Sequence, residues 1–118
     1  MSEDIVIVGM ARTPMGGLLG ELANLSASEL GAVAVKAAVA EAGTGGADAI
    51  FMGNVLSAGL GQAPARQAAL RAGLAKSTEA VTLNKMCGSG LQAVAMARQA
   101  LLAGESDAVI AGGMESMT

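Results

Sequence analysis

Four short apolar runs recur along the chain, each only four residues long. They cover residues 5–8 (IVIV), 49–52 (AIFM), 80–83 (AVTL) and 108–111 (AVIA). Runs of this length that are rich in β-branched residues are typical of strands buried on both faces. Longer segments with a helical pattern lie between them, at 27–42, 65–72 and 91–102. Strands that alternate with helices indicate βαβ units, so the pattern predicts an α/β fold with a mostly parallel sheet.

The predicted helices differ in polarity. The helix at 27–42 spaces three charged residues among apolar ones, and Ser26 with Glu29 fits a capping box at its start. The helix at 91–102 has only three polar residues, which are Gln92, Arg98 and Gln99. A helix that is apolar nearly all round belongs inside a larger protein. We therefore expect the first helix to face water and the last to be covered.

Composition and charge exclude several classes of protein. The 118 residues suffice for one domain, and 53% of them are hydrophobic, which is enough for a core of Ala, Val, Leu, Ile and Met. The net charge of −3 argues against nucleic-acid binding, and a single cysteine excludes an internal disulfide. No apolar run approaches the ~18 residues of a membrane span, and residues 1–4 (MSED) resemble neither a signal peptide nor a transit peptide. We therefore expect a cytoplasmic protein.

The only cysteine, Cys87, lies in the stretch NKMCGSGLQA between a predicted strand and a predicted helix. Gly88 and Gly90 follow it and allow the backbone to turn tightly. A thiol in this position faces the first turn of a helix, where unpaired N–H groups favour negative charge. Because the thiolate is the reactive form of cysteine, this arrangement predicts that Cys87 is a nucleophile.

Two other interpretations of this stretch stay open. A lone cysteine often serves only as a small buried hydrophobe. From Gly88 to Ala93 the sequence also matches G-x-G-x-x-A, the dinucleotide-binding fingerprint between a strand and a helix. That fingerprint needs an acidic residue about 20 positions on, at the end of the next strand. Asp107 has the right spacing but precedes the strand, whereas Glu115 follows the strand but lies too far along.

Other polar residues carry weaker signals. Arg12, in a Gly-rich loop at 9–20, fits an anion contact, a structural ion pair or a surface charge equally well. The loop at 57–63 lacks the Gly-Lys-Ser/Thr ending of a phosphate-binding loop. We interpret Ser89 as a polar residue of the first helical turn rather than as a second nucleophile, because no base accompanies it. We predict no metal site.

Three long stretches carry a resemblance, and they occur in order along the chain. They are VGMARTPMGGLLGEL, GNVLSAGLGQAPARQAALRAGL and NKMCGSGLQAVAMARQALLAG followed by DAVIAGGMESMT. Together they closely resemble the thiolases, a family of acetyl-CoA acetyltransferases and 3-ketoacyl-CoA thiolases. The resemblance implies a layered fold with strand order 3-2-1-4, in which the strand at 5–8 lies between those at 49–52 and 108–111. Right-handed crossovers then place the helix at 91–102 alone on one face of the sheet.

The resemblance also implies a function. Cys87 aligns with the cysteine that thiolases acylate, and its backbone N–H would be an oxyanion donor. The reaction would be the reversible condensation of acetyl-CoA to acetoacetyl-CoA, or the thiolytic cleavage of a 3-ketoacyl-CoA, in fatty acid or ketone metabolism. The substrates would be coenzyme A and its thioesters, with no permanently bound cofactor.

The resemblance covers only the N-terminal part of a thiolase. Residues 1–118 would form a partial domain without its last strand, the loop segment that follows and the C-terminal half. The family's catalytic histidine and second cysteine lie in that half, and this chain has no histidine. We therefore expect incomplete turnover by the chain alone and a homo-oligomer for the intact protein. Two other functions stay open: a nucleotide-binding module that uses the turn from Gly88 to Ala93, and an inert fragment that needs a partner half.

Overall fold

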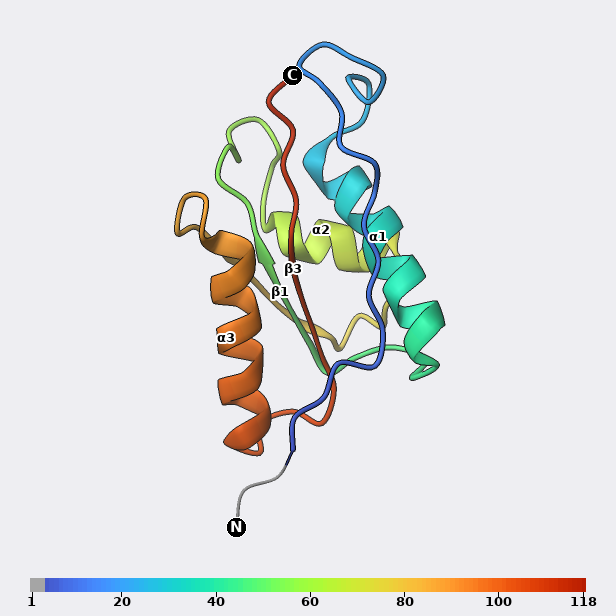
Figure 1. Ribbon diagram of the computed structural model, residues 1–118, viewed down its shortest axis with the longest axis vertical. Coiled ribbons are helices and arrows are strands. Elements are labelled where there is room, and N and C mark those ends of the chain that lie inside the picture. The colour runs from blue at the N-terminus through green and yellow to red at the C-terminus, as the bar shows by residue number, and fades with distance from the viewer. Residues whose placement is uncertain (1–3) are drawn as a thin grey trace.

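A computed structural model describes residues 4–118, which form three helices and a three-stranded sheet (Figure 1). The helices are α1 (Ala27–Ala42), α2 (Pro64–Arg71) and α3 (Ser89–Leu102). The strands are β1 (Ala49–Gly53), β2 (Glu79–Leu83) and β3 (Val109–Gly113). All three helices and three of the four predicted strands therefore form within a few residues of their predicted positions.

The sheet is parallel, and its strand order is β2-β1-β3. Ile50 of the central strand pairs with Ala80 on one side and with Ile110 on the other. Helix α2 packs against α1, β1 and β2, whereas α3 packs against β1 and β3. Figure 1 shows α3 on one side of the sheet and α1 with α2 on the other. The predicted α/β class, with helices on both faces and the last helix alone on its face, is thus confirmed.

The strand predicted at residues 5–8 does not form. These residues belong to no described strand, and the side chains of Val6, Ile7 and Val8 are largely exposed. The reason lies in β1, which already has a hydrogen-bonded partner on each edge. Because β3 pairs directly with it, no gap is left for a fourth strand. The predicted order 3-2-1-4 is therefore confirmed only in part. The strand at 5–8 is missing from it, and the other three keep their predicted order, which is β2-β1-β3.

The N-terminal segment instead runs beside α1 (Figure 1). Gly9 makes this possible, because a Cβ at this position would lie only 2.5 Å from the carbonyl oxygen of Ala38 and 2.9 Å from the amide nitrogen of Ala42. A residue with a side chain could not approach the helix backbone so closely. With the segment there, β3 keeps an outer edge that pairs with no strand in the described part of the chain.

The core lies between β1 and the helices α1 and α2, with Ile50 fully buried at its centre. Its other members are mostly small or unbranched, and they are Ala27, Val35, Met52, Ala65, Ala68, Ala69, Leu74 and Met114. Alanine-lined faces let the helices lie close to the sheet and to each other. The predicted cap of α1 is present, since the Ser26 hydroxyl oxygen accepts the Glu29 N–H at 3.2 Å. No helix in the described residues could cross a membrane.

Asp48 ties the amino-terminal ends of the three strands together. Its carboxylate oxygen Oδ2 accepts the backbone N–H groups of Asp107 at 2.8 Å and of Ala108 at 3.1 Å. Its backbone also bonds to both neighbours, donating to the Ala108 carbonyl and accepting from the Glu79 N–H. The N–H of Asp107, then that of Ala108, lower the pKa of the Asp48 carboxyl below its ordinary value of 3.8.

This lowered pKa predicts a pH-dependent effect of Asp48→Asn. A carboxyl whose pKa is lower in the folded state stabilises the protein above its unfolded pKa, and this contribution disappears as the pH falls through the folded-state value. We expect Asp48→Asn to lower the free energy of unfolding at pH 7, and the difference from the unaltered chain to shrink below pH 3.8. Urea unfolding at several pH values measures this difference.

Asp107→Asn is the matched control for this prediction, since it keeps the backbone N–H that Asp48 accepts. A stability difference for Asp48→Asn that stays constant from pH 7 to pH 3 would show that the carboxylate charge has no role in joining the strands.

Candidate active site

Cys87 lies in the turn between β2 and α3, and it is an exposed residue with a free thiol. Helix α3 begins two residues later, with Gly88 as its N-cap residue and no side chain bonded to the cap. The predicted position at the start of a helix is therefore confirmed. The alternative in which Cys87 is a buried packing residue is wrong, because the residue is not part of the core.

A network of short hydrogen bonds closes this turn. The side-chain oxygen of Asn84 accepts the Met86 N–H at 2.9 Å. The Gly88 N–H donates to the carbonyl of Lys85 at 3.0 Å, and the Ser89 N–H donates to that of Met86 at 3.1 Å. Met86 itself has a φ of 50°, in the left-handed region that non-glycine residues seldom adopt. The turn before the thiol is therefore both constrained and strained.

Gly53 lets the start of α3 rest on the carboxyl end of the sheet. A Cβ at Gly53, the last residue of β1, would lie 2.5 Å from the Cβ of Ser89. At Gly113, the last residue of β3, a Cβ would lie 3.6 Å from the Cα of Gly90, which is an ordinary contact distance. The thiol-bearing turn is thus placed at the carboxyl edge of a parallel sheet, where α/β proteins usually bind their ligands.

Glu115 joins two loops at the same edge, a role that sequence reasoning missed. One carboxylate oxygen accepts the Asn54 side-chain amide and the Leu56 N–H, each at 3.0 Å, and the other accepts the Val55 N–H at 3.0 Å. The Asn54 amide also donates to the carbonyl of Met114 at 3.1 Å. The sequence did offer one signal, because Asn54 and Glu115 each follow a predicted strand. The carboxyl ends of parallel strands meet at one edge of a sheet, so these two residues could be expected to lie near each other.

These contacts argue against the dinucleotide interpretation. Glu115 already bonds three groups of the loop after β1. Asp107 lies just before β3, at the amino end of the sheet beside Asp48, whereas the turn from Gly88 to Ala93 lies at the carboxyl end. Neither acid is therefore placed to bind the ribose of a nucleotide on that turn.

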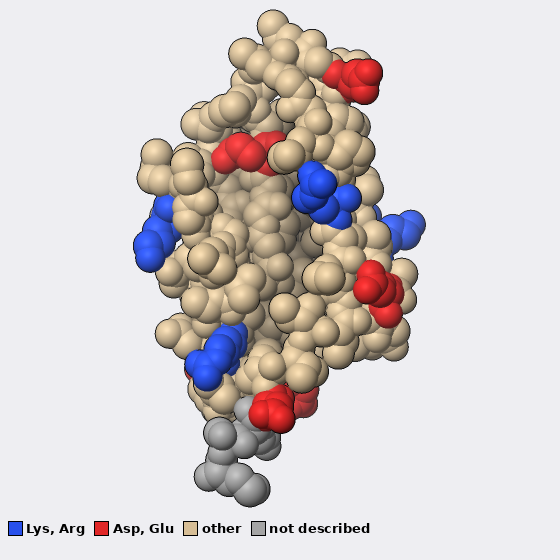
Figure 2. Space-filling model, viewed as in Figure 1, with Lys and Arg blue, Asp and Glu red and all other residues tan. Residues whose placement is uncertain are grey.

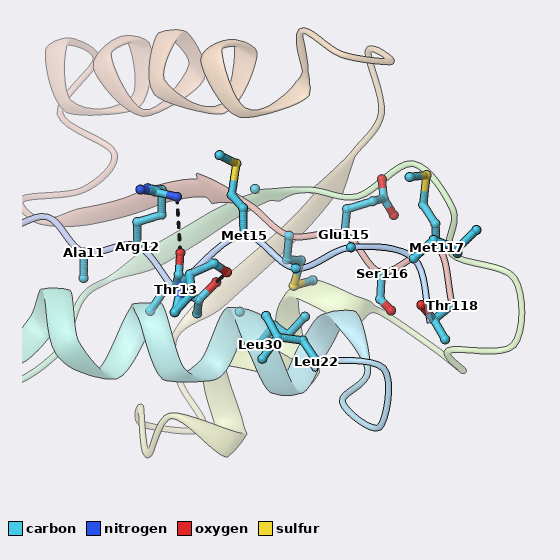
Figure 3. Close-up of a pocket in the computed structure, with 18 residues that line it drawn as sticks. Ala11, Arg12, Thr13, Met15, Leu22, Leu30, Glu115, Ser116, Met117 and Thr118 are labelled. Atoms are coloured by element: carbon cyan, nitrogen blue, oxygen red, sulfur yellow. Dashed lines mark hydrogen bonds between the residues drawn. The ribbon is translucent and has the colours of Figure 1, made fainter. Parts of the chain in front are cut away.

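A cleft of about 380 Å³ opens near the chain's last described residues (Figure 3). Its walls are the N-terminal loop, the first half of α1 and residues 113–118. Arg12 lies in this wall, where its guanidinium donates to the neighbouring carbonyl of Thr13 at 3.4 Å. Cys87 is not among the lining residues, so the cleft and the thiol are separate features.

Charged residues do not form a binding surface on the face shown in Figure 2. Basic and acidic side chains stand apart from one another around an uncharged hollow. Within residues 4–118, no three His, Cys, Asp or Glu side chains are grouped as metal ligands would be.

Comparison with known proteins gives a consistent picture. Residues 5–118 match the family model described as the N-terminal domain of thiolase. Acetyl-CoA acetyltransferase 2 of Arabidopsis thaliana is 54% identical over 98% of this chain, which covers 29% of that protein. The mitochondrial acetyl-CoA acetyltransferase of Xenopus tropicalis is 50% identical over 98% of the chain and 28% of its own length. A probable acetyl-CoA acetyltransferase of Escherichia coli K12 is 50% identical over 98% of the chain and 30% of its own length. The chain thus spans less than a third of each of these relatives.

The loop contacts of Glu115 predict that Glu115→Ala destabilises the carboxyl edge of the sheet. Hydrogen bonds to a charged group contribute about 1.5–3 kcal/mol each when buried, and less when water can replace them. Since Glu115 is exposed, we expect the free energy of unfolding to fall by roughly 1–3 kcal/mol in total. Chemical denaturation followed by circular dichroism measures this loss.

Limited proteolysis locates the effect, because cleavage after residues 54–56 should become faster in Glu115→Ala. Glu105→Ala, which removes an exposed carboxylate after α3, is the matched control. Equal stability and equal cleavage in the two variants would contradict the role given to Glu115.

Proposed function

Because this chain belongs to the thiolase family, we propose that it is the N-terminal part of an acyl-CoA acyltransferase whose nucleophile is Cys87. The observation that carries the proposal is the exposed thiol at a glycine-flanked turn, directly before α3. The Ser89 N–H already donates to the Met86 carbonyl, and the other N–H groups of the first turn of α3 have no intrahelical partner and favour negative charge next to them. An exposed thiol in this position is open to an electrophilic carbonyl that it could attack.

The proposed first step transfers an acyl group to the protein. The Cys87 thiolate attacks the carbonyl carbon of acetyl-CoA, a new thioester bond forms, and coenzyme A leaves as a thiolate that takes up a proton. The backbone N–H of Cys87 would stabilise the negative charge that develops on the carbonyl oxygen. Coenzyme A thioesters are then substrates, and the acyl-cysteine is the intermediate of a two-step, ping-pong reaction.

The second step requires groups that these residues do not provide. Condensation needs a base that removes a proton from the methyl carbon of a second acetyl-CoA, so that the carbanion can attack the acyl-cysteine. The chain contains no histidine and no cysteine besides Cys87. We propose that a further part of the protein, absent from these 118 residues, supplies this base and the proton donor.

The outer face of α3 supports the need for such a part. Leu91, Val94 and Leu102 point away from the sheet and are 78%, 44% and 45% exposed. Residues of the opposite face, among them Ala93, Ala97 and Ala100, are buried against β1 and β3. The exposed Arg98 lies between Val94 and Leu102 on this face, which is otherwise apolar. Exposed apolar side chains gathered on one helix face are typical of an interface. We propose that the missing half of the thiolase fold covers this face.

If this chain supplies the nucleophile and a further part of the protein supplies the base, the chain alone should be acylated without turnover. Incubated with acetyl-CoA, the 118-residue chain should acquire one acetyl group that intact-mass measurement detects. Cys87→Ala should abolish the adduct. Hydroxylamine at neutral pH should remove it, because a thioester is cleaved under these conditions and an acetyl-lysine is not. Acetoacetyl-CoA formation should stay at background, since the missing acid and base are each worth roughly 10²–10⁴-fold in rate.

Other outcomes of this experiment favour the rival functions. Steady acetoacetyl-CoA production would show that the base lies within these residues. A folded chain that forms no adduct would favour an inert fragment. A thermal shift with NAD, and none with acetyl-CoA, would favour a nucleotide-binding module.

The exposed face of α3 predicts that the chain alone associates or binds a hydrophobic dye. Replacing both Leu91 and Val94 by serine should reduce dye binding and shift sedimentation toward the monomer. Val33→Ser is the matched control, because Val33 is 60% exposed but lies on α1, on the other side of the sheet. A monomer without dye binding, or an equal response of the control, would show that α3 is not an interface.

A further inference from the structure

We propose that Ser89 is the residue that positions Cys87 for acyl transfer, through hydrogen bonds that hold the strained turn before the thiol. The proposal rests on the proposed function of Cys87. Ser89 is the first residue of α3 and lies two positions after the cysteine. It is only 5% exposed, although most of the turn around it is open to solvent.

The Ser89 hydroxyl bonds back into the turn. Its oxygen accepts the backbone N–H of Lys85 at 2.8 Å, and its O–H donates to the carbonyl of Met86 at 2.6 Å. The backbone N–H of Ser89 reaches the same carbonyl at 3.1 Å. From the other side, the Asn84 side chain accepts the Met86 N–H at 2.9 Å. Two side chains thus hold both backbone polar groups of Met86.

Met86 needs this support because of its conformation. A φ of 50° is unfavourable for a residue with a side chain, and such strain persists only where the surroundings impose it. The Met86 side chain cannot supply the compensation by burial, since it is 67% exposed. The hydrogen bonds from Ser89 and Asn84, together with the bond from the Gly88 N–H to the Lys85 carbonyl, therefore fix the turn. Cys87 is the next residue, so its N–H and its thiol take their direction from Met86.

Helix capping does not explain Ser89. A serine that stabilises a helix start normally occupies the N-cap position, which here is Gly88, and no side chain caps α3. Instead, Ser89 sits one residue later and directs its hydroxyl backwards. Its Cβ lies against Gly53, where the absence of a side chain provides the only room. The position of Ser89 is thus fixed, and its hydroxyl uses its hydrogen bonds on the backbone of Lys85 and Met86.

Two changes separate the hydroxyl of Ser89 from the strain that it opposes. Ser89→Ala deletes the hydroxyl and releases the backbone of Lys85 and Met86. Met86→Gly, made in the Ser89→Ala background, removes the strain, because glycine adopts a positive φ freely. We expect Ser89→Ala to slow acetylation of Cys87 by acetyl-CoA by about tenfold, and the added Met86→Gly to restore part of this loss. We expect a smaller effect, about threefold, on alkylation by iodoacetamide, because this small reagent does not need an aligned oxyanion donor.

Ser28→Ala is the matched control. Ser28 is a serine 1% exposed, and its hydroxyl bonds to Gln67 between α1 and α2, away from the turn. It tests whether a lost buried hydroxyl slows Cys87 merely by destabilising the fold. Circular dichroism and urea unfolding, run on every variant, identify any that fail to fold. Recovery of the acetylation rate on adding Met86→Gly to Ser89→Ala is a result that loss of a buried hydroxyl alone would not produce.

The outcomes separate the two proposals. If the unaltered chain is not acetylated, the proposed function fails. The rates at which iodoacetamide alkylates Cys87 in the variants then still test the role of Ser89. Slower acetylation in Ser89→Ala that the added Met86→Gly partly restores, with Ser28→Ala unchanged, supports positioning. A Ser89→Ala rate equal to that of the unaltered chain overturns it. So does an equal slowing in Ser28→Ala, or a failure of the added Met86→Gly to restore any of the rate.

Discussion

The contact between the start of α3 and the carboxyl end of the sheet is the constraint on which the candidate site depends. Gly53 leaves room for the Cβ of Ser89, and Gly113 lies against Gly90. With any side chain at Gly53, the helix would have to move away from β1. The Ser89 hydroxyl would move with it and could no longer reach Lys85 and Met86. The geometry of the thiol thus depends on the missing side chain of Gly53 on the neighbouring strand β1.

Most of the fold was predictable from the sequence because its signals are local. The runs at 49–52, 80–83 and 108–111 form strands, and Ser26 caps α1 as expected. The capping box forms only in part, because the Glu29 carboxylate accepts the hydroxyl of Ser26 and not its backbone N–H. The thiol's place before α3 also followed from a strand, two glycines and an apolar segment. The run at 5–8 carries an equally clear local signal, but whether it joins the sheet depends on contacts with residues distant in the sequence. β1 and β3 are in direct register, and Gly9 fits the N-terminal segment onto α1.

The parts of the site that were missed are those that depend on contacts between distant residues. Asn54 and Glu115 meet because β1 and β3 are neighbours, and no local pattern reveals that pairing. Ser89 was identified as a residue of the first helical turn, but its backward bonds depend on the left-handed φ of Met86. Sequence patterns do not encode a positive φ at methionine. One oxygen of buried Asn54, Oδ1, has no bonding partner in the described residues. Such an atom suits an ordered water molecule, which sequence alone cannot foretell.

The outer edge of β3 has a consequence for how the chain folds. Every strand pair is parallel, so Ala49 must find Glu79 and Val109 across long stretches of chain. Pairings between distant residues form slowly, and the apolar run at 5–8 and the unpaired N–H and C=O groups of β3 are accessible both before and after the sheet forms. An exposed strand edge is a template for another chain. In a crowded cell, this domain should therefore depend on chaperones during its synthesis more than a helical domain of equal length does.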